Sequence, residues 1–141
     1  MTLERFVAAQ EGVYDRALEE LREGRKRSHW MWFVFPQIAG LGRSETARRY
    51  AIRDRGEAAA YLAHPVLGPR LVGAARAMLA HRGRAPEAIL GPVDAMKLRS
   101  SATLFADIRG ADPIFGEVLR TFFDGRECPL TRGRLGPETP R

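Results

Sequence analysis

The sequence has little of the residues that build disulfide frameworks and metal centres. Its 141 residues include one cysteine, Cys128, and three histidines. A single thiol cannot form an internal disulfide, and no cluster in the chain has the spacing of metal ligands. The sequence therefore predicts neither a disulfide scaffold nor a bound metal, and no motif in it indicates another cofactor.

Long apolar runs are also missing. No stretch approaches the roughly 18 to 20 apolar residues of a membrane-spanning helix. The first residues, "MTLERFVAAQEG", lack the basic-then-apolar order of a secretory signal. We therefore expect a cytoplasmic protein without a membrane partner, and the sequence does not indicate an oligomeric state.

Lysine is scarce in a chain that is basic overall. Of the 23 cationic residues 21 are arginine, and the net charge is +6. Clustered cations bind phosphate by releasing counterions, but these are dispersed, and only Arg25, Lys26 and Arg27 form a tight run. A non-enzymatic basic module that binds nucleic acid or an acidic protein is therefore the second hypothesis for this chain.

Alternating strand patterns are nearly absent, and Gly and Pro divide the chain into short apolar-periodic segments. This pattern predicts a mainly α bundle of about six to eight short helices. The predicted helices cover residues 3–23, 44–52, 57–63, 66–82, 86–90, 92–108 and 112–124. Residues 1–125 are predicted to form one globular domain. Residues 126–141 have little apolar content, so we expect a mobile C-terminal tail.

The helix that starts at Pro92 mixes polar and apolar side chains on one face. Steps of roughly 100° per residue bring Asp94, Lys97 and Ser101 to the side of the bulky apolar residues. Burial of such groups is costly unless they are paired or face a cavity. One interpretation is an internal Asp94–Lys97 ion pair with Ser101 bonded one turn along. The other is a binding site, in which Lys97 with Ser100 or Ser101 holds phosphate or ribose.

Residues 26–37, "KRSHWMWFVFPQ", concentrate the aromatic side chains of the chain. Either a helix or a strand over residues 29–35 would bury this segment, so it is typical of a core. Trp30 or Trp32 could also stack on a flat ring, with His29 and Gln37 as polar groups at the two ends. The two roles are compatible, and we expect a pocket between this segment and the "DAMKLRSS" helix.

The strings "LERFVAAQEGVYDRALEELREGRKRSHWMWFVFPQIAGLGRSETARRYAI", "EAAAYLAHPVLGPRL" and "GPVDAMKLRSSATLF" resemble the domain of unknown function eighteen-ten family over nearly all of residues 3–125. Its members are sometimes labelled calpastatin, which would imply a protease inhibitor. The compact aromatic chain lacks the disorder of an extended inhibitor, so we set that label aside. The resemblance implies no particular activity.

The order of features is also similar, more distantly, to the NADAR domains of the YbiA type. That similarity implies ADP-ribose and N-glycosidic chemistry. Glu45, in the "SETA" helix, lies where a catalytic acid would be sought, although an acid in a first helical turn also suits the helix dipole.

The first hypothesis is therefore a protein that binds a small nucleotide- or ADP-ribose-like molecule, with hydrolysis of an N-glycosidic bond as its reaction. Its candidate catalytic residues are Asp94, Lys97, His29 and Glu45. Its candidate ligand-binding residues are Trp30, Trp32, Gln37, Ser100 and Ser101.

Overall fold

The computed structural model describes residues 3–136, and this range contains ten helices and no strand. The helices are α1 Glu4–Gln10, α2 Tyr14–Glu23, α3 Met31–Val34, α4 Glu45–Arg49, α5 Arg55–Ala63, α6 Leu67–Leu79, α7 Pro86–Leu90, α8 Pro92–Ala106, α9 Ile114–Phe123 and α10 Pro129–Leu135. The prediction of a mainly α protein is confirmed.

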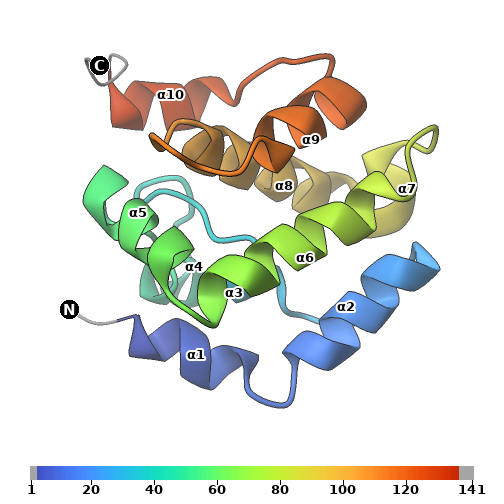
Figure 1. Cartoon of the computed structure of the whole chain (residues 1–141), viewed down its shortest axis with the longest axis horizontal. Coiled ribbons are helices and arrows are strands. Elements are labelled where there is room, and N and C mark those ends of the chain that lie inside the picture. Colours follow the sequence, from blue (N-terminus) through green and yellow to red (C-terminus); the bar gives the residue numbers. More distant parts are fainter. Residues whose placement is uncertain (1–2, 137–141) are drawn as a thin grey trace.

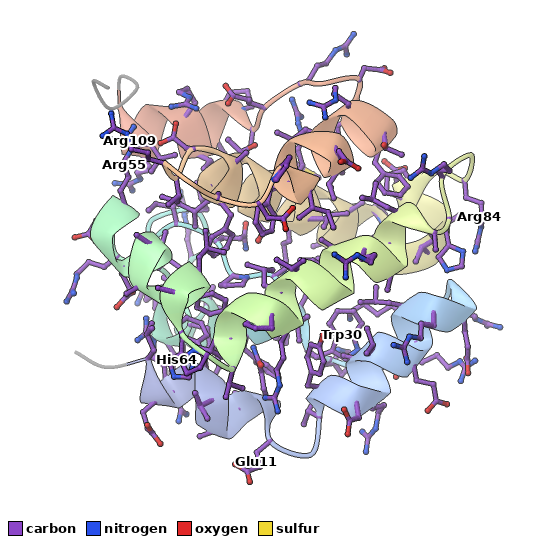
Figure 2. All side chains as sticks on the ribbon, viewed as in Figure 1. Glu11, Trp30, Arg55, His64, Arg84 and Arg109 are labelled. Atoms are coloured by element: carbon purple, nitrogen blue, oxygen red, sulfur yellow. The ribbon has the colours of Figure 1, made fainter. Side chains whose placement is uncertain are left out.

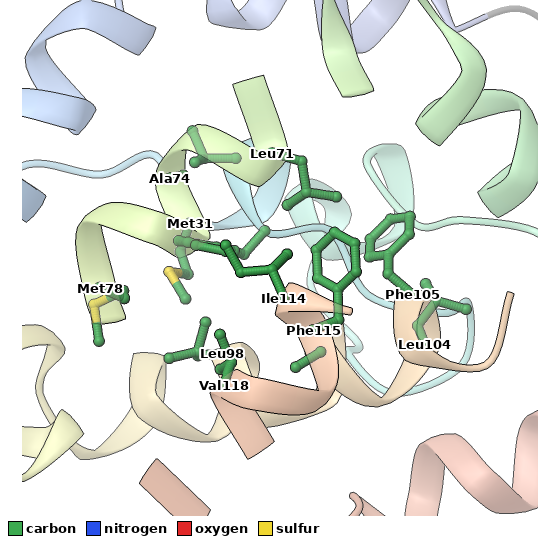
Figure 3. Close-up of a cluster of buried hydrophobic side chains, with 14 of the residues drawn as sticks. Met31, Leu71, Ala74, Met78, Leu98, Leu104, Phe105, Ile114, Phe115 and Val118 are labelled. Atoms are coloured by element: carbon green, nitrogen blue, oxygen red, sulfur yellow. The ribbon is translucent and has the colours of Figure 1, made fainter. Parts of the chain in front are cut away.

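The two longest helices, α6 and α8, form the middle of the bundle (Figure 1). Helix α6 packs against α2, α5 and α9, and α8 packs against α5, α7, α9 and α10. Figure 3 shows apolar side chains of α3, α6, α8 and α9 converging between them. Since each fully buried large apolar side chain contributes about 1.5 to 3 kcal/mol, this cluster supplies much of the driving force for folding.

The helix predicted over residues 3–23 is divided in two. Helix α1 ends at Gln10, and α2 begins at Tyr14 after Gly12, whose φ is +72°. A left-handed φ of this kind ends a helix and favours glycine. After the division α2 packs against α6 and α1 packs against α3, and the extra helix accounts for part of the difference between ten helices and the predicted six to eight.

The aromatic segment forms a short helix rather than a strand. Helix α3 has four residues, Met31–Val34, and the chain then runs into a single parallel β-bridge between Ile38 and Ile52. In this bridge Ala39 N–H donates to Ile52 O at 2.7 Å, and Ile52 N–H donates to Gln37 O at 2.8 Å. The bridge fixes Gln37 beside the loop that leads into α4.

Ser44 caps α4 as predicted, because its Oγ accepts the N–H of Ala47 at 3.0 Å. The helix nevertheless ends at Arg49 and not near Ile52. The backbone of Ile52 is committed to the β-bridge, and a residue cannot serve both that bridge and a helical hydrogen-bond ladder.

A mobile tail was predicted from residue 126, but the structure differs from this prediction within residues 126–136. Residues 129–135 form α10, which packs on α8, and Thr131 and Leu135 are buried. Polar contacts anchor α10: Arg132 lies 3.0 Å from Asp107, and Arg55 donates to Leu135 O at 2.7 Å. Apolar content alone therefore underestimated the order of this segment, and residues 137–141 lie outside the described range.

Across residues 3–136, no helix has the length and apolar character that a bilayer crossing requires.

Candidate functional site

The aromatic segment and α8 meet through a cluster of three charged side chains. Lys26 Nζ lies 2.9 Å from Asp94 Oδ2, and Lys97 Nζ lies 3.4 Å from Asp94 Oδ1. The two lysines of the chain therefore share one carboxylate, and their side chains are largely shielded from solvent. The expected adjacency of the two segments is present, and Lys26 is an unexpected member of the cluster.

Both lysines also lie against tryptophan rings. Lys97 Nζ is 4.6 Å from the Trp32 ring centroid, and Lys26 Nζ is 5.0 Å from that of Trp30. Such contacts contribute about 0.5 to 2 kcal/mol, depending on desolvation. The cluster thus connects α8 to the aromatic segment. This arrangement agrees with the interpretation of Asp94 and Lys97 as an internal ion pair.

The two serines of α8 differ in their surroundings. Ser101 is buried and, among the described residues, makes no hydrogen bond with Asp94 or Lys97. The Ser100 hydroxyl bonds Met96 O at 3.1 Å and approaches Cys128 Sγ at 3.2 Å. Ser100 is therefore directed toward the start of α10 and not toward the tryptophans.

Trp30 is enclosed in the core, where Figure 2 shows it between α2 and α6. Its indole N–H donates to Glu20 Oε1 at 2.9 Å. The same carboxylate accepts the backbone N–H of Arg27 at 2.8 Å, the N–H of Ser28 at 3.0 Å and the Ser28 hydroxyl at 2.7 Å. The polar group of the Trp30 side chain is therefore satisfied inside the core, which is typical of a structural role.

Glu20 is the residue of this region that the sequence analysis missed. Burial raises its pKa, but the hydrogen bonds from Ser28, Arg27 and Trp30 outweigh burial and lower the pKa to about 2. The signal was present in the sequence, because Glu20 follows Ala17 and precedes Leu21 on the inward face of α2. An acid on such a face indicates a buried partner that donates hydrogen bonds.

A hollow of about 170 Å³ lies beside Trp32. Its lining comes from α3, the bridge region and α4, and consists of Trp32, Gln37, Ile38, Ala39, Gly40, Gly42, Ala47, Arg48, Tyr50 and Ala51. Trp32 and Gln37, two of the predicted ligand-binding residues, therefore share one hollow. Arg48 and Tyr50 are lining residues that the sequence analysis did not predict.

The lining of this hollow has few charges and several unused polar groups. Arg48 is its one charged residue, and no carboxylate lines it. Within residues 3–136, the side-chain amide of Gln37 and the guanidinium of Arg48 make no hydrogen bond or ion pair. The arrangement can accommodate a ring against Trp32, a hydrogen-bonding edge at Gln37 and a negative charge at Arg48.

The remaining predicted residues lie elsewhere. His29 and Glu45 are exposed, and neither lines the hollow. Of the basic run, Lys26 is bound to Asp94 and Arg27 pairs with Glu23, so the run does not form a free cationic patch. Within the described range, no group of His, Cys, Asp and Glu is arranged to hold a metal ion.

A larger hollow of about 460 Å³ lies between α5, α6 and the loop after α8. Small apolar side chains such as Ala59, Leu62 and Val72 form most of its wall, with Arg109 and Asp112 at the loop. None of the predicted site residues lines it. Volume alone therefore favours this hollow, but the stacking and hydrogen-bonding groups gather at the smaller one.

A model of one protein family matches residues 1–135. The chain belongs to the family of proteins of unknown function DUF1810. The match includes α10, in agreement with its packing against α8. Among solved structures, the chain is similar to the conserved hypothetical protein Rv1873 from Mycobacterium tuberculosis, with a TM-score of 0.92 and 50% identity. The similarity covers 94% of this chain and 95% of the other. No curated protein matches the chain.

Proposed function

We propose that this DUF1810 protein binds a small anionic molecule with one planar ring system, of the mononucleotide type, in the hollow beside Trp32. The observation that carries the proposal is the gathering of Trp32, Gln37 and Arg48 around one hollow. An aromatic surface, an amide and a cation can recognise, respectively, the face of a ring, its edge and an anion.

Trp32 supplies the stacking surface. It is half-buried, and Lys97, itself paired with Asp94, lies against its ring. Stacking of a base on an aromatic side chain contributes about 1 to 3 kcal/mol. A ring that is already held in place loses little conformational freedom on binding, so more of this contribution is available to the complex.

Gln37 supplies the hydrogen-bonding group. Its side-chain amide offers two donors and an acceptor, which can pair with the edge of a heterocyclic base. Its backbone carbonyl accepts from Ile52 N–H at 2.8 Å, so the position of Gln37 is set by the β-bridge. A base whose edge is substituted so that it cannot form hydrogen bonds with the Gln37 amide should therefore bind less well.

The volume of the hollow limits the size of the ligand. An apolar cavity of about 150 Å³ suffices for benzene, so about 170 Å³ encloses one ring system and little more. The sugar and phosphate of a mononucleotide would lie at the open rim. We therefore favour a mononucleotide over the larger ADP-ribose.

The proposal concerns binding and not cleavage of the N-glycosidic bond. Cleavage of glycosides commonly relies on carboxylates that flank an oxocarbenium-like centre. No carboxylate lines the hollow, and both Asp94 oxygens face lysine ammonium groups. Steady release of free base from a bound mononucleotide, measured by chromatography, would contradict this part of the proposal.

Isothermal titration with adenosine, guanosine, cytidine and uridine monophosphates tests the proposal. We expect one of them to bind, and Trp32→Leu to weaken that binding about tenfold because stacking is lost. Phe123→Leu is the matched control, since Phe123 is a partly buried aromatic residue on α9, away from the hollow. The absence of binding at millimolar concentrations, or equal binding by the Trp32→Leu variant, would refute the proposal.

A further inference from the structure

Arginines without carboxylate partners gather around the loop of residues 39–43. Arg43 belongs to this loop, Arg48 lies on α4, and Arg134 reaches the loop from α10. In residues 3–136 none of the three forms an ion pair, whereas Lys26 and Lys97 share the carboxylate of Asp94. Glu45, the carboxylate nearest to Arg43 and Arg48 in sequence, is exposed and forms no ion pair with either in that range.

Two glycines let this loop approach its neighbours. The φ of Gly40 is +98°, and a Cβ at Gly40 would collide with the guanidinium of Arg134, which donates to Gly40 O at 3.4 Å. A Cβ at Gly42 would overlap the side chain of Ala47 on α4. Gly42 therefore lets the loop pack against α4, and Gly40 leaves room for the guanidinium of Arg134 from α10.

The loop also carries backbone donors that are not used. The N–H groups of Gly40 and Gly42 make no hydrogen bond with any described residue, and both glycines line the hollow. Free backbone N–H groups in a turn are a common kind of site for oxyanions. The N–H of Ala39, by contrast, is committed to Ile52 O.

We infer that Arg48 and the loop of residues 39–43 form a phosphate subsite, which makes the hollow select phosphate monoesters over unphosphorylated nucleosides. This inference rests on the proposed function and specifies where the anion binds. It moves the phosphate away from Lys97, which the sequence favoured. Lys97 is paired with Asp94 and lies on the Trp32 ring, whereas Arg48 faces the hollow with its charge uncompensated.

The test compares a nucleoside monophosphate with its nucleoside by isothermal titration. The pair is adenosine monophosphate and adenosine, unless the first titration selects another base. We expect the nucleoside to bind about tenfold more weakly, because it lacks the charge-assisted hydrogen bonds of the phosphate. Arg48→Gln should remove most of this preference, because it should weaken binding of the monophosphate far more than binding of the nucleoside. Lys97→Met should preserve the preference, and so should Arg16→Gln, a matched control at an exposed arginine on α2.

Each outcome separates the inference from the proposed function. Equal affinities for nucleoside and monophosphate in the unmodified protein would overturn the phosphate subsite and leave ring binding intact. Loss of the preference in Lys97→Met but not in Arg48→Gln would place the phosphate at Lys97 and also overturn the inference. Binding of inorganic phosphate alone, with no effect of the base, would support the subsite and refute the nucleotide as its ligand.

Discussion

The two tryptophans of the chain lie two residues apart and have opposite surroundings. Trp30 is fully buried, and its indole N–H is bonded to the Glu20 carboxylate. Trp32 is half-buried, lines a hollow and contacts Lys97. An aromatic-rich segment can therefore contain both a core residue and a candidate binding residue, and the partner of each indole ring distinguishes them.

The largest expected difference concerns stability. Trp30→Ala should lower the free energy of unfolding by about 3 to 5 kcal/mol, because a large ring is removed from a packed core. Trp32→Ala should cost about 1 to 2 kcal/mol, since that ring is already partly exposed. Urea denaturation measures both, and equal losses would contradict the division between a core and a binding tryptophan.

Removal of the Glu20 charge should have the next largest effect. Glu20→Gln replaces a carboxylate that accepts hydrogen bonds from Trp30, Arg27 and Ser28 with an amide that has one oxygen. We expect a loss of about 2 kcal/mol at pH 7. Glu23→Gln, an exposed acid on the same helix, is the matched control.

The Glu20 contribution should also depend on pH in a defined direction. Its pKa is lowered from 4.5 to about 2 in the folded protein, so its stabilisation is complete above pH 4.5. It is lost as the pH falls from 4.5 toward 2, because protons then favour the unfolded chain. The stability difference between Glu20→Gln and the unmodified protein should shrink over this window, and a constant difference would contradict the assigned role.

The cluster around Asp94 should contribute less. Asp94→Asn should cost about 1 to 2 kcal/mol, because it leaves Lys26 and Lys97 without their shared carboxylate in a partly shielded site. Lys97→Met should lower the free energy of unfolding less in the Asp94→Asn variant than in the unmodified protein. Additive losses in this double-mutant cycle would mean that the ion pair is not a tether between α8 and the aromatic segment.

Arg48→Gln should have the smallest effect on stability, within about 0.5 kcal/mol, because Arg48 is exposed and has no partner among the described residues. A melting temperature equal to that of the unmodified protein, measured together with weaker binding, would separate a ligand contact from a structural one. A strong loss of stability would assign Arg48 to the scaffold.

Local signals predicted the helical class and several boundaries. The Ser44 cap is present, and Asp112 accepts the N–H of Ile114 at 2.9 Å at the start of α9. Local signals failed where tertiary contacts decide. The Ile38–Ile52 bridge shortened α4, and the contacts of Arg132 and Arg55 ordered α10 in a segment with few apolar residues.

The candidate site was predictable in part for the same reason. Helical periodicity predicted that Asp94 and Lys97 lie on the inward face of α8. In the structure the two are paired, and Lys97 contacts Trp32 of the aromatic segment. The role of Lys26 was not predicted, because a run of cations in the sequence is typical of an exposed loop. Arg48 was missed because only the β-bridge brings α4 beside Gln37, and no local pattern encodes that pairing.

The most direct test of the account follows the two indole N–H signals by nuclear magnetic resonance during titration with a mononucleotide, assigned with the Trp32→Phe variant. The account predicts that the Trp32 signal moves with ligand concentration and saturates, while the Trp30 signal, bonded to Glu20, stays in place. A titration that moves the Trp30 signal alone, or neither signal, would contradict the claim that the hollow beside Trp32 is the binding site.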